Sequence, residues 1–514
     1  MRKIILAAET PKNQVYMYSI AAASRFHKVS FLFIFFFLVV CASAAHTTAQ
    51  SPLPEPGPAR SVNVPAVKET KLKNGLTVAV VEKKGVPIVS VQLLVRAGAA
   101  SEGMKKAGLA NLTADMLTKG TKTRTAEQIA EEMEFLGSSL SSGAGWNSST
   151  VGMSVTSDKL DAAMAIMSDV VLNPSFKQEE LDLLKSQTLD ELKYNLTQPG
   201  FLANYVASKW SYGEHPTGGT PASITAMGRA DVETFYKSAF QPQTAVLIFV
   251  GDISQATAAK TAEDHFGNWA SAPMGKAAVG STRNSERSSN DVYARFLVVD
   301  LPESGQAAVN YLVPIKGAGR SSKDYYAASV LNSLLGGGYS SRLNQEIRIK
   351  RGLSYGAGSN FSWRSESSNF GARTQTKDVS AAEVAELIVA EIKRLAEGDP
   401  TAAELGPRKS VLTGGFGRNL ETNGGLAGAI ADLYSFGIPA SELNAYMANV
   451  NNVQSATIKS FAAKNFVNGD IVIVGDYAKF KDDLAKRFPN AKIEVVKADE
   501  LDIESSTLKR SDIQ

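Results

Sequence analysis

The same order of predicted strands and helices occurs twice along this chain, about 210 residues apart, which is too long a period for a solenoid repeat. In the first half, β-rich runs and helical stretches lie at 76–81, 88–95, 107–118, 126–136, 137–157, 160–172, 178–196, 244–250 and 256–269. In the second half, segments of the same kinds lie at 296–299, 307–313, 325–335, 343–350, 354–377, 381–395 and 471–474. A duplicated domain explains both sets.

Neither half alternates strictly between strand and helix, as a doubly wound sheet would require. The pattern therefore predicts an α+β protein with two homologous domains, each a mainly antiparallel sheet packed with helices. Residues 276–292 (KAAVGSTRNSERSSNDV) are polar and poor in hydrophobic residues, which is typical of a linker. We expect the domains to span 69–275 and 293–492, with a polar tail at 493–514.

The N-terminal residues have the composition of a secretory signal. Residues 29–40 read VSFLFIFFFLVV, basic residues precede them, and small residues follow at 42–45. This pattern predicts a signal peptide over 1–45, with Met17 as an alternative start. An uncleaved anchor and a lipoprotein modified at Cys41 are less favoured, because the apolar run is shorter than the roughly 20 residues of a spanning helix and Val40 is large. Residues 46–68 are Pro-rich and resemble an extended tether.

The cysteine content and the net charge indicate the cellular compartment and the class of binding partner. Cys41 is the only cysteine, so the mature chain would have none. Export without disulfides favours the periplasm of a Gram-negative bacterium. The 54 basic and 51 acidic residues give a net charge of +3, which does not indicate a nucleic-acid binder. After signal cleavage we expect no membrane span.

The segment GLANLTADMLTKGT, residues 108–121, resembles the zinc-binding helix of the pitrilysin/insulinase family, G-x-A-H-F-L-E-H-M-L-F-K-G-T. The residues of the H-x-x-E-H motif do not match, but seven others do: Gly108, Ala110, Met116, Leu117, Lys119, Gly120 and Thr121. The resemblance places Asn111 and Asp115 at the two histidine positions and Ala114 at the glutamate. The helix FKQEELDLLKSQTLDELK, residues 176–193, resembles the element that carries the third ligand and places Glu191 there.

These substitutions remove the family's chemistry. Two histidines at i and i+4 hold one zinc ion, and the glutamate activates the bound water. Asn111 is a poor ligand, Asp115 is an acceptable one, and Ala114 cannot transfer a proton. Loss of a general base alone lowers a rate by about 10²–10⁴. We therefore expect this chain to hold no metal or other cofactor, and His215 and His265 to have loop and surface roles.

The second half carries a match without losses. Residues 334–361, LLGGGYSSRLNQEIRIKRGLSYGAGSNF, resemble the C-terminal-domain stretch L-G-G-G-x-S-S-R-L…L-R-x-x-x-G-L-x-Y of the same family. The resemblance implies that Arg348 and Tyr355 are the pair that contacts substrate, with a permanently charged donor fork and a phenol that can stabilise an oxyanion. Alternatively, Arg348 caps a helix end and Tyr355 packs in a strand. In two-subunit members, one chain carries H-x-x-E-H and the other carries this pair.

The sequence thus predicts a non-catalytic, substrate-binding subunit of a heterodimeric zinc peptidase, inactive alone and acting on peptides in the periplasm. The expected partner is a homologous catalytic subunit that carries H-x-x-E-H and the zinc ion. A structural or peptide-binding scaffold without a role in proteolysis is the first alternative. An atypical autonomous metallopeptidase that uses Asp115 and Glu191 is the second.

Overall fold

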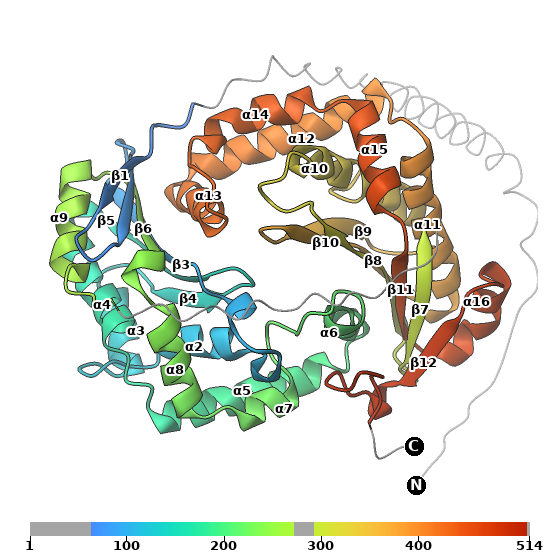
Figure 1. The fold of residues 1–514 in the computed structure, drawn as a ribbon, viewed down its shortest axis with the longest axis horizontal. Coiled ribbons are helices and arrows are strands. Elements are labelled where there is room, and N and C mark those ends of the chain that lie inside the picture. Colours follow the sequence, from blue (N-terminus) through green and yellow to red (C-terminus); the bar gives the residue numbers. More distant parts are fainter. Residues whose placement is uncertain (1–62, 272–291, 511–514) are drawn as a thin grey trace, which may run out of the picture. The chain divides into compact units, whose positions relative to one another are not determined.

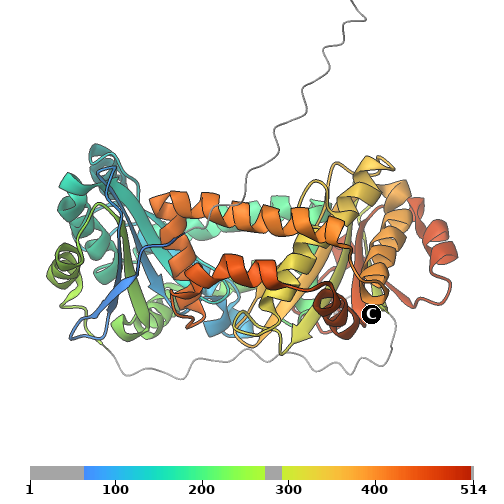
Figure 2. The same cartoon turned by 90° about the horizontal axis from the view of Figure 1, so that it is seen from above.

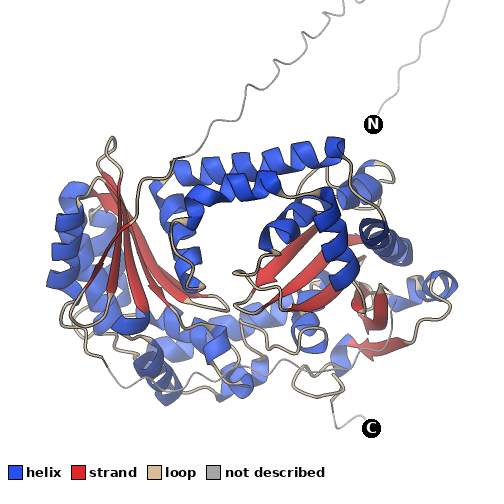
Figure 3. Ribbon diagram, turned by 45° about the horizontal axis from the view of Figure 1, so that its top comes forward, coloured by secondary structure: helices blue, strands red, loops and turns tan. Residues whose placement is uncertain are grey.

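The computed structural model describes residues 63–271 and 292–510, which belong to one compact unit. The predicted signal peptide, most of the tether and most of the linker lie outside these ranges. Within the described ranges the strands form two separate six-stranded sheets with helices packed against them (Figure 3). The predicted α+β class with two similar sheets is therefore confirmed. No helix in the described ranges combines the length and the apolarity needed to cross a bilayer.

The first sheet has the strand order β1-β2-β6-β3-β5-β4 (Figure 1). Its strands are β1 (Lys68–Lys71), β2 (Thr77–Glu82), β3 (Ile88–Val95), β4 (Ser141–Ala144), β5 (Ser149–Thr156) and β6 (Ala245–Gly251). Only β2 and β6 run parallel, and the other neighbours are antiparallel. Every residue of β6 is buried, which agrees with its uninterrupted apolar sequence.

The helices of the first half follow the predicted order and include three that were not predicted, α6 to α8. They are α2 (Leu109–Leu117), α3 (Ala126–Phe135), α4 (Leu160–Leu172), α5 (Gln178–Asn195), α6 (Pro199–Trp210), α7 (Pro221–Ala226), α8 (Arg229–Ala239) and α9 (Gln255–Phe266). Thr125 caps the start of helix α3, and its side chain and that of Gln128 form a reciprocal capping box.

The second sheet has the order β12-β7-β11-β8-β10-β9. Its strands are β7 (Tyr293–Asp300), β8 (Gln306–Lys316), β9 (Ala357–Trp363), β10 (Ser367–Lys377), β11 (Gly469–Gly475) and β12 (Ile493–Lys497). Strand β12 runs parallel to β7 at the edge of the sheet. The first five residues of the expected polar tail at 493–514 therefore form a strand, which main-chain pairing with β7 holds at the sheet edge.

The helices of the second half include several that were not predicted from the sequence. They are α10 (Tyr325–Leu335), α11 (Ala381–Glu397), α12 (Ala402–Glu421), α13 (Asn423–Ser435), α14 (Glu442–Asn452), α15 (Ser455–Asn465) and α16 (Lys481–Arg487). In Figure 2 the long orange helix α12 lies beside α14, and the two helices are in contact. The predicted helix at 343–350 is a π-helical segment, η5 (Asn344–Ile349).

Each half covers one face of the other half's sheet with a helix. Leu202 and Val206 of α6 share a buried core with Leu312 and other residues of the second sheet. Conversely, Leu426 and Ile430 of α13 share a core with residues of the first sheet. Figure 1 shows α6 beside the strands of the second sheet. The duplicated halves are therefore interdependent.

Candidate functional site

Helix α2 presents the positions at which the sequence predicts a degenerate zinc motif. Gly108 precedes the helix with a φ of 90°, and a Cβ at this residue would lie 2.9 Å from the Cα of Gly219. Only glycine fits both the backbone angle and this close approach. The helix is thereby held against the loop that follows α6, and Asn111 faces that loop.

Asn111 uses both ends of its amide in structural hydrogen bonds. Its Nδ2 donates to the carbonyl of Thr217 at 2.8 Å, and its Oδ1 accepts from the main-chain N–H of Ala144 at 3.2 Å. Ala144 belongs to the edge strand β4. Asn111 therefore ties the loop, α2 and β4 together.

The other two α2 positions and Glu191 differ in exposure. Ala114 is fully buried, and burial raises the pKa of the half-buried Asp115 carboxyl. Glu191 is exposed on α5, where it accepts a 3.4 Å hydrogen bond from Asn195 one turn later. Helices α2 and α5 are in contact.

Arg348 and Tyr355 lie on either side of the turn that joins η5 to β9. The guanidinium of Arg348 lies 4.9 Å from the ring centroid of Tyr339, and it makes no hydrogen bond or ion pair within the described part of the chain. Tyr355 is 91% exposed. The backbone around it is fixed, because its two neighbours in the chain, Ser354 and Gly356, are joined by two hydrogen bonds.

A cavity of about 390 Å³ lies where the first half meets the second sheet. Its lining includes Asn111 and Trp146 from the first half and Arg364, Asn369 and Arg373 from the second. Aromatic side chains of α6 complete the wall, namely those of Phe201 and Tyr205. The Arg364 side chain lies 4.5 Å from the ring centroid of Trp146.

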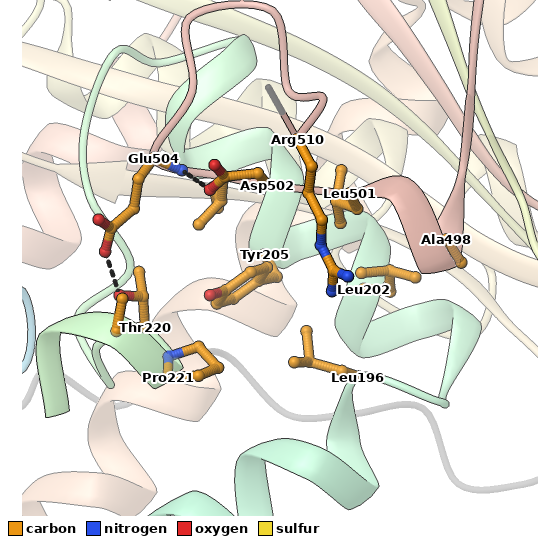
Figure 4. A pocket seen from close by; sticks show the side chains of 12 residues that line it. Leu196, Leu202, Tyr205, Thr220, Pro221, Ala498, Leu501, Asp502, Glu504 and Arg510 are labelled. Carbon is orange, nitrogen blue, oxygen red and sulfur yellow. Dashed lines mark hydrogen bonds between the residues drawn. The ribbon is translucent and has the colours of Figure 1, made fainter. Parts of the chain in front are cut away.

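A second cavity, of about 410 Å³, lies against the same helix (Figure 4). The C-terminal segment that follows β12 lines one side of it, and Thr220 donates a 2.5 Å hydrogen bond to Glu504 of that segment. Arg510 reaches into this cavity from the C-terminal side. Tyr205 lines both cavities, so it separates them.

Comparison with known proteins identifies the family. The family description "Insulinase (Peptidase family M16)" matches residues 77–209, and "Peptidase M16 inactive domain" matches residues 226–412. An uncharacterized zinc protease of Mycobacterium leprae is 28% identical over 359 residues, which cover 69% of this chain and 79% of that protein. The chain belongs to the pitrilysin/insulinase family.

Solved structures of other proteins share this fold. The structure of a peptidase M16 inactive domain from Pseudomonas fluorescens aligns with a TM-score of 0.71 at 25% identity, covering 80% of this chain and 98% of that one. A protease from Helicobacter pylori aligns with a TM-score of 0.74 at 21% identity, covering 80% and 100%.

A pitrilysin/insulinase zinc ion does not fit the residues present on α2. The Oδ1 of Asn111 already accepts the N–H of Ala144, so this oxygen is not available to a metal ion. No group of three or more His, Cys, Asp or Glu side chains suited to a metal ion occurs within residues 63–271 and 292–510. Asp115 and Glu191 alone supply two carboxylates and no imidazole, a poor set for zinc.

The histidines have other roles. His265 lies within 2.8 Å of the Asp161 carboxylate, at the surface between α9 and α4. His215, expected as a loop residue, is buried against the Trp146 ring, with ring centroids 5.2 Å apart. Its Nδ1 lies 3.4 Å from a carboxylate oxygen of Glu102.

Glu102 is a buried carboxyl that was not predicted as a site residue. Its two oxygens accept main-chain N–H bonds from Gly108 and Ala110 at the start of α2, at 2.7 and 2.5 Å. Burial raises the pKa of Glu102 to about 8, although these hydrogen bonds oppose the increase, and burial lowers the pKa of His215. The sequence shows only an acidic residue six positions before Gly108. The burial of Glu102 could not be predicted, because it depends on the tertiary fold.

Proposed function

We propose that this chain is the non-catalytic, substrate-binding subunit of a heterodimeric zinc metallopeptidase that degrades or processes peptides in the periplasm. One observation carries the proposal. On α2, Asn111 makes structural hydrogen bonds and Ala114 is buried, so neither can serve a zinc site. The side chains of Arg348 and Tyr355, in contrast, have hydrogen-bond donors without an acceptor in the described part of the chain.

The surroundings of the pair support a role toward another molecule. A helix-capping arginine would donate to carbonyl oxygens, but the Arg348 guanidinium lies over the Tyr339 ring instead. A tyrosine with a packing role would be buried, but Tyr355 is 91% exposed. Neither the Arg348 guanidinium nor the Tyr355 phenol makes a hydrogen bond within the described part of the chain, whereas both groups are suited to a peptide carbonyl.

The first sheet offers a place for an extended peptide. Strand β4 (Ser141–Ala144) is the last strand of its sheet and, among the described residues, pairs with β5 alone, while the N–H of Ala144 is bonded to Asn111. Free main-chain groups at a sheet edge can accept another strand. Helix α2 packs beside β4, so a peptide bound there would lie close to the degenerate positions.

A homologous subunit with H-x-x-E-H would supply the zinc ion and the general base. This chain would supply Arg348, Tyr355 and part of the substrate-binding surface. The N-terminal sequence supports export to the periplasm, where both subunits would meet their peptides.

The test is a reconstituted pair made from this chain and a neighbouring-gene homologue with an intact motif. We expect cleavage of a quenched fluorescent peptide only by the pair. Tyr355→Phe should lower kcat by about 10²–10³, the usual cost of one lost oxyanion donor, and Arg348→Ala should lower kcat/KM. The matched control is Arg351→Ala, because Arg351 is already paired with Glu346.

Other results would select the alternatives. Unchanged cleavage with both variants would favour a scaffold without a role in catalysis. Chelator-sensitive cleavage by this chain alone, freed of contaminants, would favour an autonomous peptidase.

A further inference from the structure

The cavity between α6 and the second sheet has an unbalanced charge. Of its two arginines, Arg364 is neutralised by Glu214, with bonds of 3.1 and 2.7 Å from Nε and Nη2 to the two carboxylate oxygens. Arg373 has no carboxylate within ion-pair distance in the described ranges. Its Nη1 donates to the neutral amide of Asn360, and its buried Nε has no hydrogen-bond partner among the residues that the structure describes.

Strand β10 directs two polar side chains into this cavity. Asn369, Gly371 and Arg373 alternate along one face, while Phe370 and Ala372 point into the opposite core. A Cβ on Gly371 would lie 2.5 Å from the Arg373 guanidinium, so this group lies over the glycine, toward Asn369. Asn369 is 7% exposed, and its amide makes no hydrogen bond within the described part of the chain.

A buried donor without a partner costs free energy, and the cost is larger for a charged donor. The cavity combines a guanidinium that lacks a carboxylate partner and an amide that makes no hydrogen bond in the described ranges with the aromatic walls of Trp146, Phe201 and Tyr205. A carboxylate matches the planar fork of arginine, and an apolar side chain next to it would contact the aromatic rings. A single uncompensated positive charge suits a monoanion better than a phosphate dianion.

We propose that this cavity binds the free C-terminal carboxylate of a peptide, with Arg373 and Asn369 as donors to the carboxylate. The proposal rests on the proposed function, because it assigns one end of the peptide that such a subunit would hold. Arg348 and Tyr355 lie outside this cavity and would contact other parts of the same substrate.

The experiment measures peptide affinity of the full mature chain by fluorescence anisotropy. A labelled decapeptide with an apolar last residue is compared as free acid and as C-terminal amide. We expect the free acid to bind at least about tenfold more tightly, as a charge-assisted hydrogen bond implies. Arg373→Gln should remove this difference. Asn369→Asp is isosteric, pairs with Arg373 and repels a carboxylate, so it should remove the difference without disturbing the fold.

Arg510→Gln is the matched control, because Arg510 lines the separate cavity on the other side of Tyr205 (Figure 4). We expect this variant to keep the preference for the free acid. A third peptide, amidated and ending in glutamate, distinguishes the main-chain carboxylate from a side-chain carboxylate and should bind as weakly as the plain amide.

Three results would overturn the proposal: equal binding of acid and amide, equal binding of acid and Glu-terminated amide, or equal losses for the Arg373 and Arg510 variants. Each leaves the subunit's role in cleavage untouched if the reconstituted pair still hydrolyses both peptides. If the pair hydrolyses neither peptide while the free-acid preference holds, the proposed function fails and the carboxylate site stands.

Discussion

Arg364 and Glu214 join the two halves of the chain through a two-pronged ion pair that is largely shielded from water. The arginine follows β9 in the second sheet, and the glutamate lies in the loop after α6. The guanidinium also lies over the Trp146 ring, which in turn contacts His215. The pair therefore connects the second sheet to the loop that holds α2 in place.

Breaking this pair from one side should destabilise the protein strongly. Arg364→Met leaves the Glu214 carboxylate, which is 12% exposed, without its partner. We expect a loss of about 3 kcal/mol in the free energy of unfolding, measured by urea denaturation. The control is Lys260→Met, since its pair with Asp264 lies at the surface and should contribute little to stability. If both variants lost the same free energy of unfolding, burial would not strengthen the pair between Arg364 and Glu214.

The buried Glu102 should make stability depend on pH. Its pKa is raised from 4.5 to about 8, so between these values the unfolded chain has released a proton that the folded chain keeps. The free energy of unfolding should therefore fall as pH rises from about 4.5 to 8, by up to about 1.4 kcal/mol per pH unit, and level off above pH 8. Glu102→Gln should lack this decline.

The measurement is a series of urea midpoints for both proteins across that pH range. His215 also contributes there, because burial lowers its pKa in the folded protein. Its contribution to stability falls as pH drops below about 6.5, where the unfolded chain takes up a proton. The difference between the variant and the parent isolates the Glu102 contribution. A difference that stays constant with pH would mean that Glu102 ionises normally in the folded protein.

Gly108 should tolerate no side chain. Alanine there would require a positive φ and would bring its Cβ to 2.9 Å from the Gly219 backbone. We expect Gly108→Ala to cost at least about 2 kcal/mol in thermal or urea unfolding. Gly103→Ala is the control, because nothing lies within 4 Å of its Cβ position and its φ is −75°. Equal stability of the two variants would contradict the close approach of α2 to the loop.

Zinc should not stabilise the natural chain. With the Oδ1 of Asn111 engaged and no imidazole on α2, we expect the same Tm with excess zinc as with chelator. In Asn111→His with Asp115→His, two imidazoles would lie one turn apart and Glu191 on the contacting helix α5 is the expected third ligand, so zinc should raise the stability by about 2.7 kcal/mol at 100 times Kd. This variant should still hydrolyse nothing, since Ala114 remains. A zinc-dependent rise in the Tm of the natural chain would refute the assignment.

Segments with strong apolar periodicity were predictable from sequence. Strand β3 (Ile88–Val95) and helices α4 (Leu160–Leu172) and α10 (Tyr325–Leu335) have the predicted bounds. Other helices were not predictable, because their local composition does not favour a helix. Helix α13 reads NGGLAGAIADLYS, with three glycines that weaken any helix signal, and it exists because it buries its apolar side chains on the first sheet.

The family resemblance located α2 and the Arg348 and Tyr355 pair, but not the side chains that surround them. Motif letters cannot show that Asn111 bonds to Thr217 and Ala144, since these partners lie 106 and 33 residues away. The cavity with Arg373 and Asn369 was equally hidden, because a guanidinium on a strand looks like any exposed surface charge until α6 covers it.

The exchange of α6 and α13 between the halves has a consequence for how the protein can be taken apart. Either half, expressed alone, would expose the apolar sheet face that a helix of the other half covers. We therefore expect neither half to be stable as a monomer. Conversely, a chain nicked between β6 and β7 should elute from gel filtration as a single particle. The two repeats therefore do not fold independently, although they are homologous.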